Sequence, residues 1–146
     1  MWSKITAATV LCPAGTRFTN GVAWNPAPLP EGETEVVFLD VGQGDAVLIL
    51  QNGAACLIDA GPKDARQNLV QDLRSYGVSQ LDLLVMTHPH ADHVGGMQAV
   101  LQNFDVQTLL TPDLSETDVT GQTQRTLQTA QECGVPVETA YAGQQY

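Results

Sequence analysis

The sequence predicts a mixed α/β fold, because three closely spaced strand patterns are followed by a regular alternation of helix and strand patterns. The strand patterns are short aliphatic runs between turn residues, and the helix patterns repeat apolar residues at spacings of three and four. A chain of 146 residues forms one domain at most and can bury roughly two-thirds of its unfolded surface. We therefore expect a single hydrophobic core.

Residues 1–34 are expected to be an N-terminal strand or linker segment. They end in the proline- and glycine-rich stretch "NPAPLPEGETE", which is typical of a loop or boundary. The opening residues carry one lysine and a short apolar stretch, which makes a poor secretory signal. No apolar run approaches the roughly 18 residues that span a bilayer. We therefore place the folded domain at residues 35–146.

The first part of this domain reads as three strands, at residues 35–41, 46–52 and 54–61. A tight "GQGD" turn joins the first two strands, and Asn52-Gly53, a dipeptide typical of two-residue hairpins, joins the next two. The runs of aliphatic residues indicate that these strands are buried, and Cys56 within "AACLID" is expected to be a small buried hydrophobe.

Helices and strands then alternate to the end of the chain. Residues 63–76 have the apolar spacing of an amphipathic helix, and Gly77 follows as its C-terminal cap. The later elements are a strand at 81–87, a short helix at 94–104, a strand at 106–112, a helix at 123–134 and a last strand within 136–146. We expect a mostly antiparallel or mixed sheet, with the helices near 63–76 and 122–133 packed on one face.

All three histidines of the chain lie in the stretch "LLVMTHPHADHVGG". The preceding strand places His88 at its carboxyl end, where α/β proteins gather ligands. His88 and His90 can turn their rings to the same side of an extended loop, and Asp92 and His93 follow at the start of a helix. Imidazoles and a carboxylate suit zinc, and also iron or manganese. The spacing H-x-H-x-D-H favours a metal site over solvated loop histidines.

Three stretches resemble a known family. "THPHADHVGG" resembles the metal-binding signature of the metallo-β-lactamase fold, a diverse set of mostly dinuclear hydrolases, and "LIDAG" resembles the Asp-x-Gly strand end of that fold. "VVFLDVGQGDAVLI" resembles the hallmark of the ComEC-type competence proteins, whose soluble domain of this fold is associated with DNA uptake. The resemblance covers residues 35–146.

The resemblance implies two divalent metal ions, with zinc as the first choice and manganese or iron as alternatives. His88 and His90 would bind the first ion, and Asp92 and His93 the second. Asp92 would also orient the attacking water, which makes it the catalytic candidate. Asp59 would support the metal loop through hydrogen bonds.

Gln43 and Asp45 would lie near the same site by this resemblance. A tight glycine turn in which Asp45 bonds its own backbone explains this pair equally well. The glycines Gly95 and Gly96 are expected to leave room beside the metals for backbone or substrate.

The family also uses a further histidine, a bridging aspartate and a last histidine from its later half. No histidine follows His93, and nothing in their surroundings marks Asp105, Asp113 or Asp118 as the bridge. We therefore expect the N-terminal half of an αββα sandwich, with partial or weak metal occupancy. A second copy of the chain, or a complementary fragment, would then cover the open sheet.

The function implied by the resemblance is metal-dependent hydrolysis of nucleic-acid phosphodiesters. The family domain is attached to a membrane protein, which implies a place outside the cytoplasm at the cell surface. A net charge of −10 argues against a generic basic patch for nucleic acid, so the metals would hold the phosphate. Two alternatives stay open: an inactive metal-binding or structural half-domain, and a hydrolase of a small ester, thioester or lactam.

Overall fold

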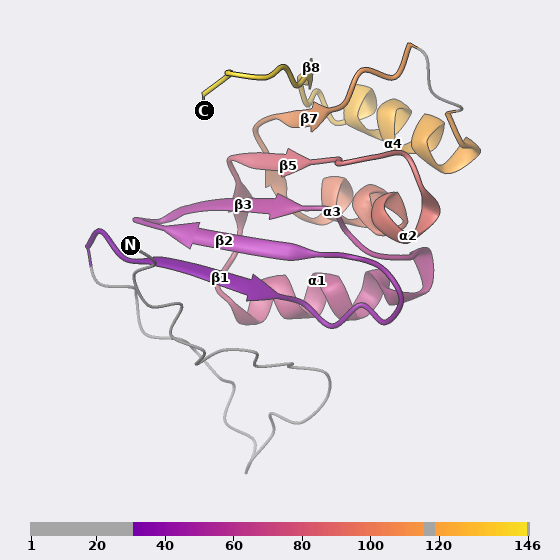
Figure 1. Cartoon of the computed structure of the whole chain (residues 1–146). Helices are drawn as coiled ribbons and strands as arrows, with labels where there is room; N and C mark the ends of the chain where they lie inside the picture. Colours follow the sequence, from indigo (N-terminus) through magenta and orange to yellow (C-terminus); the bar gives the residue numbers. More distant parts are fainter. Residues whose placement is uncertain (1–30, 116–118, 146) are drawn as a thin grey trace.

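The computed structural model describes residues 31–115 and 119–145, which form a sheet with helices packed against it (Figure 1). The sheet has six strands in the order β1-β2-β3-β5-β7-β8. Their bounds are Thr34–Phe38 for β1, Val47–Gln51 for β2, Ala54–Ile58 for β3, Leu83–Val85 for β5, Leu109–Thr111 for β7 and Val137–Thr139 for β8. The predicted α/β class is confirmed.

The sheet is mixed, as predicted. Strands β1, β2 and β3 pair antiparallel as a meander, and β3, β5, β7 and β8 pair parallel. Asn52 and Gly53 form the tight turn between β2 and β3, with positive φ angles of 50° and 85°. Both residue types tolerate this backbone region, which the hairpin turn requires.

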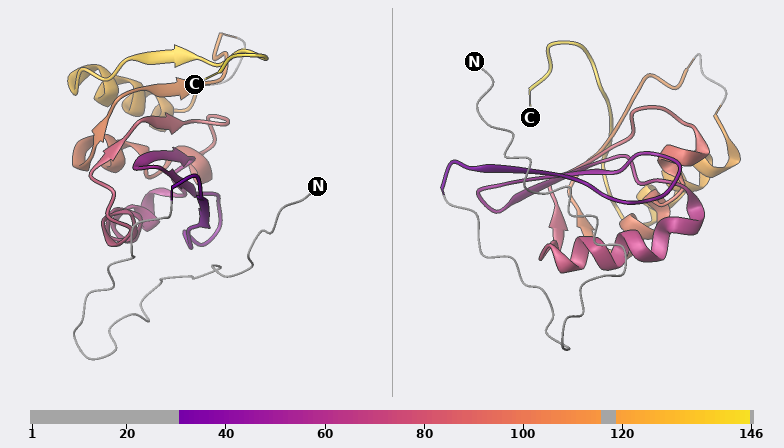
Figure 2. Two further views of the ribbon diagram at one scale, coloured as in Figure 1. Left: turned by 90° about the vertical axis from the view of Figure 1, so that its left-hand side faces the viewer. Right: turned by 60° about the horizontal axis from the view of Figure 1, so that its bottom comes forward.

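The helices lie on one face of the sheet, as Figure 2 shows. Successive parallel strands add in one direction across the sheet, so right-handed crossovers place every connecting helix on the same side. These elements are the 3-10 turn η1 (Lys63–Ala65) and helices α1 (Arg66–Ser75), α2 (Ala91–Val94), α3 (Met97–Asn103) and α4 (Gly121–Glu132). The core between the layers includes Leu48, Leu57, Leu69, Leu73, Leu84, Met97 and Val100, all fully buried.

Two predicted strands are each divided in the structure. Residues 81–87 give β4 (Gln80–Leu81) and then β5, and residues 106–112 give β6 (Asp105–Val106) and then β7. Strands β4 and β6 pair with each other in a separate two-stranded sheet. The break after β4 falls at Asp82, whose backbone and carboxylate both bond the backbone of Ala55. This local pairing has no signature in the aliphatic pattern.

The predicted helix at 94–104 is also divided, because α2 ends at Val94 and α3 begins at Met97. A Cβ on Gly95 would lie 2.2 Å from the backbone nitrogen of Lys63, and one on Gly96 would lie 2.2 Å from the carbonyl oxygen of Ala60. The two glycines therefore make room for the backbone that follows β3. The expected close approach of backbone at Gly95 and Gly96 is confirmed, and the approach of substrate stays a prediction.

The second face of the sheet is apolar and open among the residues that the structure describes. The strand register places Phe38, Val47, Ile58 and Val85 in one row on this face. Phe38 is 62% exposed and Val36 is 46% exposed. The expected burial of the strands is thus right for one face only, and Cys56 is half-buried instead of buried.

Candidate metal centre

Three segments meet at the carboxyl ends of β3 and β5. Asp59 directly follows β3, His88 follows β5 by three residues, and α2 carries Asp92 and His93. Because β3 and β5 are parallel neighbours, their ends lie at the same edge of the sheet. The ring centroid of His88 lies 4.7 Å from that of His90 and 3.7 Å from that of His93. The structure thus brings Asp59 together with the four predicted metal ligands.

Two overlapping groups could hold a metal ion, one of Asp59, His88 and His93 and one of His88, His90 and Asp92. Within each group, one ligand atom per residue lies within 4.8 Å of the others. Ligand atoms roughly 2.0–2.2 Å from one tetrahedral zinc ion are about 3.4 Å apart, so atoms at the upper limit of this separation would move together by roughly 1 Å when the ion binds. The donor set of imidazole nitrogens and carboxylate oxygens fits a divalent ion.

Asp59 is better suited to supporting the ligands than to binding metal. It is 2% exposed, and its carboxylate accepts from the Thr87 backbone N–H at 2.9 Å, the Thr87 hydroxyl at 2.5 Å and the His93 Nδ1–H at 2.8 Å. These three bonds occupy both carboxylate oxygens. The carboxylate therefore acts as the partner that orients ligand residues.

These hydrogen bonds also select the free nitrogen of two rings. His93 donates from Nδ1 to Asp59, which leaves Nε2 with its lone pair. The single hydroxyl proton of Thr87 goes to Asp59, so the hydroxyl accepts from His88 Nδ1 at 2.9 Å. His88 thus also keeps Nε2 free. Both rings are prepared as metal ligands by one buried carboxylate.

The backbone at Asp59 is held in a rare conformation. Its φ of 58° lies in the left-handed region, which a non-glycine residue seldom adopts. Bonds from the Asp59 N–H to Val85 O at 2.8 Å and from the Ala60 N–H to His93 O at 2.7 Å flank it. Such local strain persists where the surrounding structure fixes it, and it is frequent at functional sites.

Asp92 and His90 lie on the outer side of this support. The carboxylate of Asp92 is 42% exposed, and its Oδ2 lies 3.8 Å from Nε2 of His93. Asp92 also groups with His88 and His90, so its carboxylate lies close to all three imidazoles. The exposed position of His90 leaves this side of the cluster open to solvent.

The turn between β1 and β2 brings Asp45 to the cluster. Its Oδ2 lies 3.7 Å from Nδ1 of His93, and its side chain is 70% exposed. Gln43 is exposed in the same turn and makes no hydrogen bond to the cluster within residues 31–115 and 119–145. The side-chain bond of this turn comes from Asp40, which accepts the Gly42 N–H at 3.1 Å. Asp45 is therefore adjacent to the site, and a role of Gln43 near it stays a prediction.

The sequence analysis missed two threonines that hold the histidine loop from α4. The hydroxyls of Thr120 and Thr123 donate to the carbonyl oxygen of Pro89 at 3.3 and 3.2 Å. Thr120 is also the N-cap of α4, because its Oγ1 accepts the Thr123 N–H. The capping pattern is readable in the sequence, whereas the contact with residue 89 is not. Thr87 was missed too, although it directly precedes His88.

The aspartates considered as a bridging ligand are not among the metal-binding groups of the described residues. Asp105 lies in β6, and Asp113 follows β7 in a loop. Hydrogen bonds from Ser115 lower the pKa of Asp113. Asp118 lies outside the described residues.

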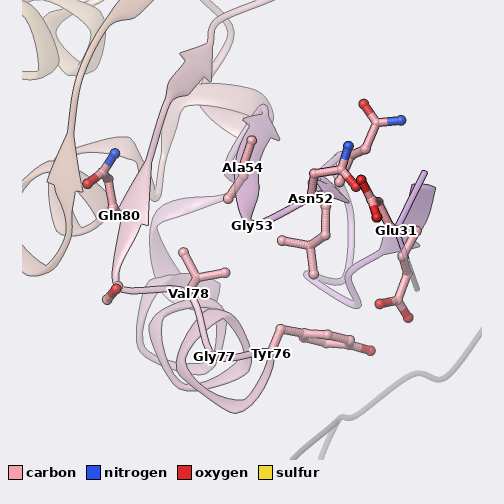
Figure 3. A pocket seen from close by; sticks show the side chains of 13 residues that line it. Glu31, Asn52, Gly53, Ala54, Tyr76, Gly77, Val78 and Gln80 are labelled. Atoms are coloured by element: carbon pink, nitrogen blue, oxygen red, sulfur yellow. The ribbon is translucent and has the colours of Figure 1, made fainter. Parts of the chain in front are cut away.

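A cavity of about 720 Å³ lies away from the histidines at the other end of β2 and β3. Figure 3 shows Asn52, Gly53, Tyr76 and Val78 around it, with Glu31 at its rim. None of the predicted site residues lines this cavity. The chemistry of the histidine cluster, and not cavity size, therefore identifies the candidate site.

Comparisons with known proteins agree with this reading. The family model described as "Metallo-beta-lactamase superfamily" matches residues 39–127, which is more than half of the chain. "Competence protein ComA" of Neisseria gonorrhoeae is 41% identical over 80 residues, covering 54% of this chain and 12% of its own length. "ComE operon protein 3" of Bacillus subtilis is 31% identical over 137 residues, covering 80% of this chain and 17% of its own length.

The fold is shared with solved structures. The metallo-beta-lactamase SMB-1 bound to 2-mercaptoethanesulfonate has a TM-score of 0.53 at 23% identity, covering 78% of this chain and 46% of that one. A metallo-beta-lactamase from Cronobacter sakazakii also gives 0.53, at 18% identity, covering 76% of this chain and 46% of that one. This chain thus spans less than half of these structures and less than a fifth of the two competence relatives. It belongs to the metallo-beta-lactamase superfamily, whose fold implies divalent-metal binding, and it is similar to competence proteins.

Proposed function

We propose that this chain carries part of a divalent-metal hydrolase centre that acts on the phosphodiesters of nucleic acid. The observation that carries the proposal is the convergence of His88, His90, Asp92 and His93 at one solvent-reachable point, backed by Asp59. The competence names of two relatives favour nucleic acid over a small ester, thioester or lactam as the substrate.

Each side chain has a separate part in this proposal. His88 and His93 present Nε2 because their Nδ1 atoms are engaged. Bound divalent ions would supply Lewis acidity, which lowers the pKa of a water and neutralises phosphoryl oxygens. Asp92 is the half-exposed carboxylate beside the imidazoles, so it would orient the attacking water and accept its proton. The net charge of −10 makes such neutralisation necessary for an anionic substrate.

Metal occupancy is expected to be weak in this chain. No histidine follows His93 in the sequence, so the four predicted ligands leave coordination positions to water, to another chain or to further residues. Titration with Zn²⁺ or Mn²⁺, followed by calorimetry, measures this affinity. Tight binding of two ions by a monomer would show that the ligand set is larger than we propose.

Hydrolysis is tested with a single-stranded oligonucleotide and Mn²⁺ or Zn²⁺. We expect negligible turnover by the isolated monomer, because each ion would lack at least one protein ligand, so the residual cleavage is measured at high protein concentration, and EDTA should abolish it. Asp92→Asn should lower the rate at least tenfold, since it removes the proton acceptor while keeping the shape. Asp113→Asn is the matched control, because Asp113 is outside the metal-binding groups. Equal rates for both variants, or no cleavage in any metal, would contradict the proposal.

A further inference from the structure

A second cavity, of about 90 Å³, lies between η1, α1, α3 and α4 on the helical side of the molecule. Lys63, Arg66 and Arg125 line it, together with the amide side chains of Gln98, Gln102 and Gln122. The chain has six lysines and arginines against sixteen acidic residues. Half of its positive side chains therefore gather around one small pocket in a strongly acidic protein. The net charge of −10 therefore does not describe the charge at this place.

Within residues 31–115 and 119–145, the three positive charges of the pocket have no acidic partner. Among the described residues, Lys63, Arg66 and Arg125 form no ion pair, and the Arg66 guanidinium bonds only the Lys63 carbonyl oxygen, at 2.6 Å. Arg74, on the same helix as Arg66, instead bonds the Asn103 amide and lies over the Phe104 ring. Like charges around one pocket repel each other and attract an anion, so an anion bound there would be favoured by all three side chains.

The pocket suits a phosphate group in both size and donors. A water molecule has a share of about 30 Å³ in the liquid, so the cavity has room for roughly three waters or one tetrahedral oxyanion. Guanidinium groups match phosphate oxygens in two-pronged hydrogen bonds, and an ammonium and amide N–H groups can complete the shell. A carboxylate ligand would leave several of these donors unused.

The pocket is also linked to the metal loop. Gly95 lines it and lies two residues after His93, and the closest atom to a Cβ on Gly95 would be the backbone nitrogen of Lys63. The backbone of residues 60–63 therefore packs against the glycines that follow His93, and this contact joins the basic pocket to the histidine cluster.

We propose that Lys63, Arg66 and Arg125 form a phosphate-binding subsite for the backbone of the nucleic-acid substrate. The pocket itself rests on its own charges and size. Only the source of the phosphate rests on the proposed function. A subsite of this kind holds the strand by its backbone and gives the acidic protein a local attraction for a polyanion.

The test uses the metal-free chain in EDTA, so that metal cannot capture phosphate. Inorganic phosphate is titrated by NMR, and a fluorescent single-stranded oligonucleotide is titrated by anisotropy at several salt concentrations. We expect phosphate to shift the amide signals of residues 63–66, 95 and 121–125. Arg66→Gln with Arg125→Gln should weaken both ligands at least tenfold and reduce the salt slope of oligonucleotide binding by about one to two.

Arg74→Gln is the matched control, because it removes the same kind of charge outside the pocket, and it should bind both ligands as the original chain does. Gln98→Glu places a carboxylate at the pocket wall and should weaken binding without removing any arginine. Amide spectra of each variant check the fold. If the arginine substitutions weakened the binding of inorganic phosphate but not of the oligonucleotide, the pocket would bind a free phosphate compound and not the nucleic-acid backbone. Equal binding by all variants would overturn the subsite, whereas failure of the hydrolase proposal would appear only in the Asp92→Asn cleavage assay.

Discussion

Asp59 Oδ2 lies 2.8 Å from His93 Nδ1, although 34 residues separate the two in the chain. The contact joins the end of β3 to helix α2 and fixes which nitrogen of His93 faces the cluster. The same carboxylate accepts the Thr87 hydroxyl, which in turn accepts from His88. One buried residue therefore orients two of the three imidazoles.

Asp59→Asn should weaken metal binding while keeping the fold. Asparagine tolerates the φ of 58° at this position, but its neutral amide accepts more weakly and can present an N–H to His93. Loss of such an orienting partner typically costs 10–100-fold in metal affinity. Calorimetric titration with Zn²⁺ measures this change, and circular dichroism checks the fold. Unchanged affinity would show that Asp59 does not orient the ligands.

Gly44→Ala should disturb the cluster through the backbone of Asp92. A Cβ at Gly44 would lie 2.1 Å from the Asp92 carbonyl oxygen, a contact that requires displacement. Gly42 is the matched control, because it has a φ of 75° in the same turn with nothing within 4 Å of its Cβ. Gly42→Ala incurs about 1 kcal/mol from its left-handed backbone, and Gly44→Ala incurs about 1–3 kcal/mol because its φ of 135° is rarer still for a residue with a side chain. Thermal melts and metal titrations should show a further loss in Gly44→Ala alone.

Thr123→Val should loosen the histidine loop from α4. The variant keeps the shape of a buried side chain and removes the hydrogen bond to Pro89 O, worth about 0.5–1.5 kcal/mol. Thr126→Val is the control, since the equally buried Thr126 hydroxyl bonds Gln122 O within its own helix. Both variants should lose some stability, but only Thr123→Val should lower metal affinity. Equal metal affinities of the two variants would show that Thr123 stabilises the fold without positioning the metal ligands.

The open sheet face should make the isolated chain associate with itself. Phe38 is 62% exposed in a row with other apolar side chains, and contiguous apolar surface of this kind marks interaction sites. Phe38→Ser should shift the population toward monomer in light scattering coupled to gel filtration. Tyr141→Ser is a control, because Tyr141 is 69% exposed outside the strands. A monomeric original chain would contradict the expectation of a second copy.

Cys56 should react more slowly with alkylating reagents than Cys133. Burial, and then the negative charge of Asp82, raise the pKa of the Cys56 thiol above its ordinary value of 9.0, whereas Cys133 is exposed. Because the folded state favours the neutral thiol, this contribution to stability is present below about pH 9 and is lost as the pH rises through the higher folded pKa. Mass spectrometry after iodoacetamide treatment at pH 8 measures both rates. Equal labelling of the two cysteines would contradict the burial of Cys56.

The sequence by itself determined the class of the fold and the residues of the cluster. Local patterns sufficed for this, because the hairpin dipeptide at Asn52, the capping glycines and the periodicity of α1 and α4 depend on neighbours in the chain. The ligand spacing of residues 88–93 is equally local. The resemblance of "VVFLDVGQGDAVLI" added the family, which the comparisons bear out.

Only the tertiary structure decided how the cluster is held and what lies beside it. The bonds of Asp59 to His93, and of Thr123 to Pro89, join segments about 34 residues apart, and no spacing rule in the sequence relates such pairs. The division of the strand at Asp82 arises likewise from its bonds to Ala55, 27 residues away. The basic pocket also depends on tertiary structure, because packing brings Lys63 of η1, Arg66 of α1 and Arg125 of α4 to one place. The net charge of the chain does not reveal such a cluster, since it sums over all residues, whereas anion binding depends on the local charge.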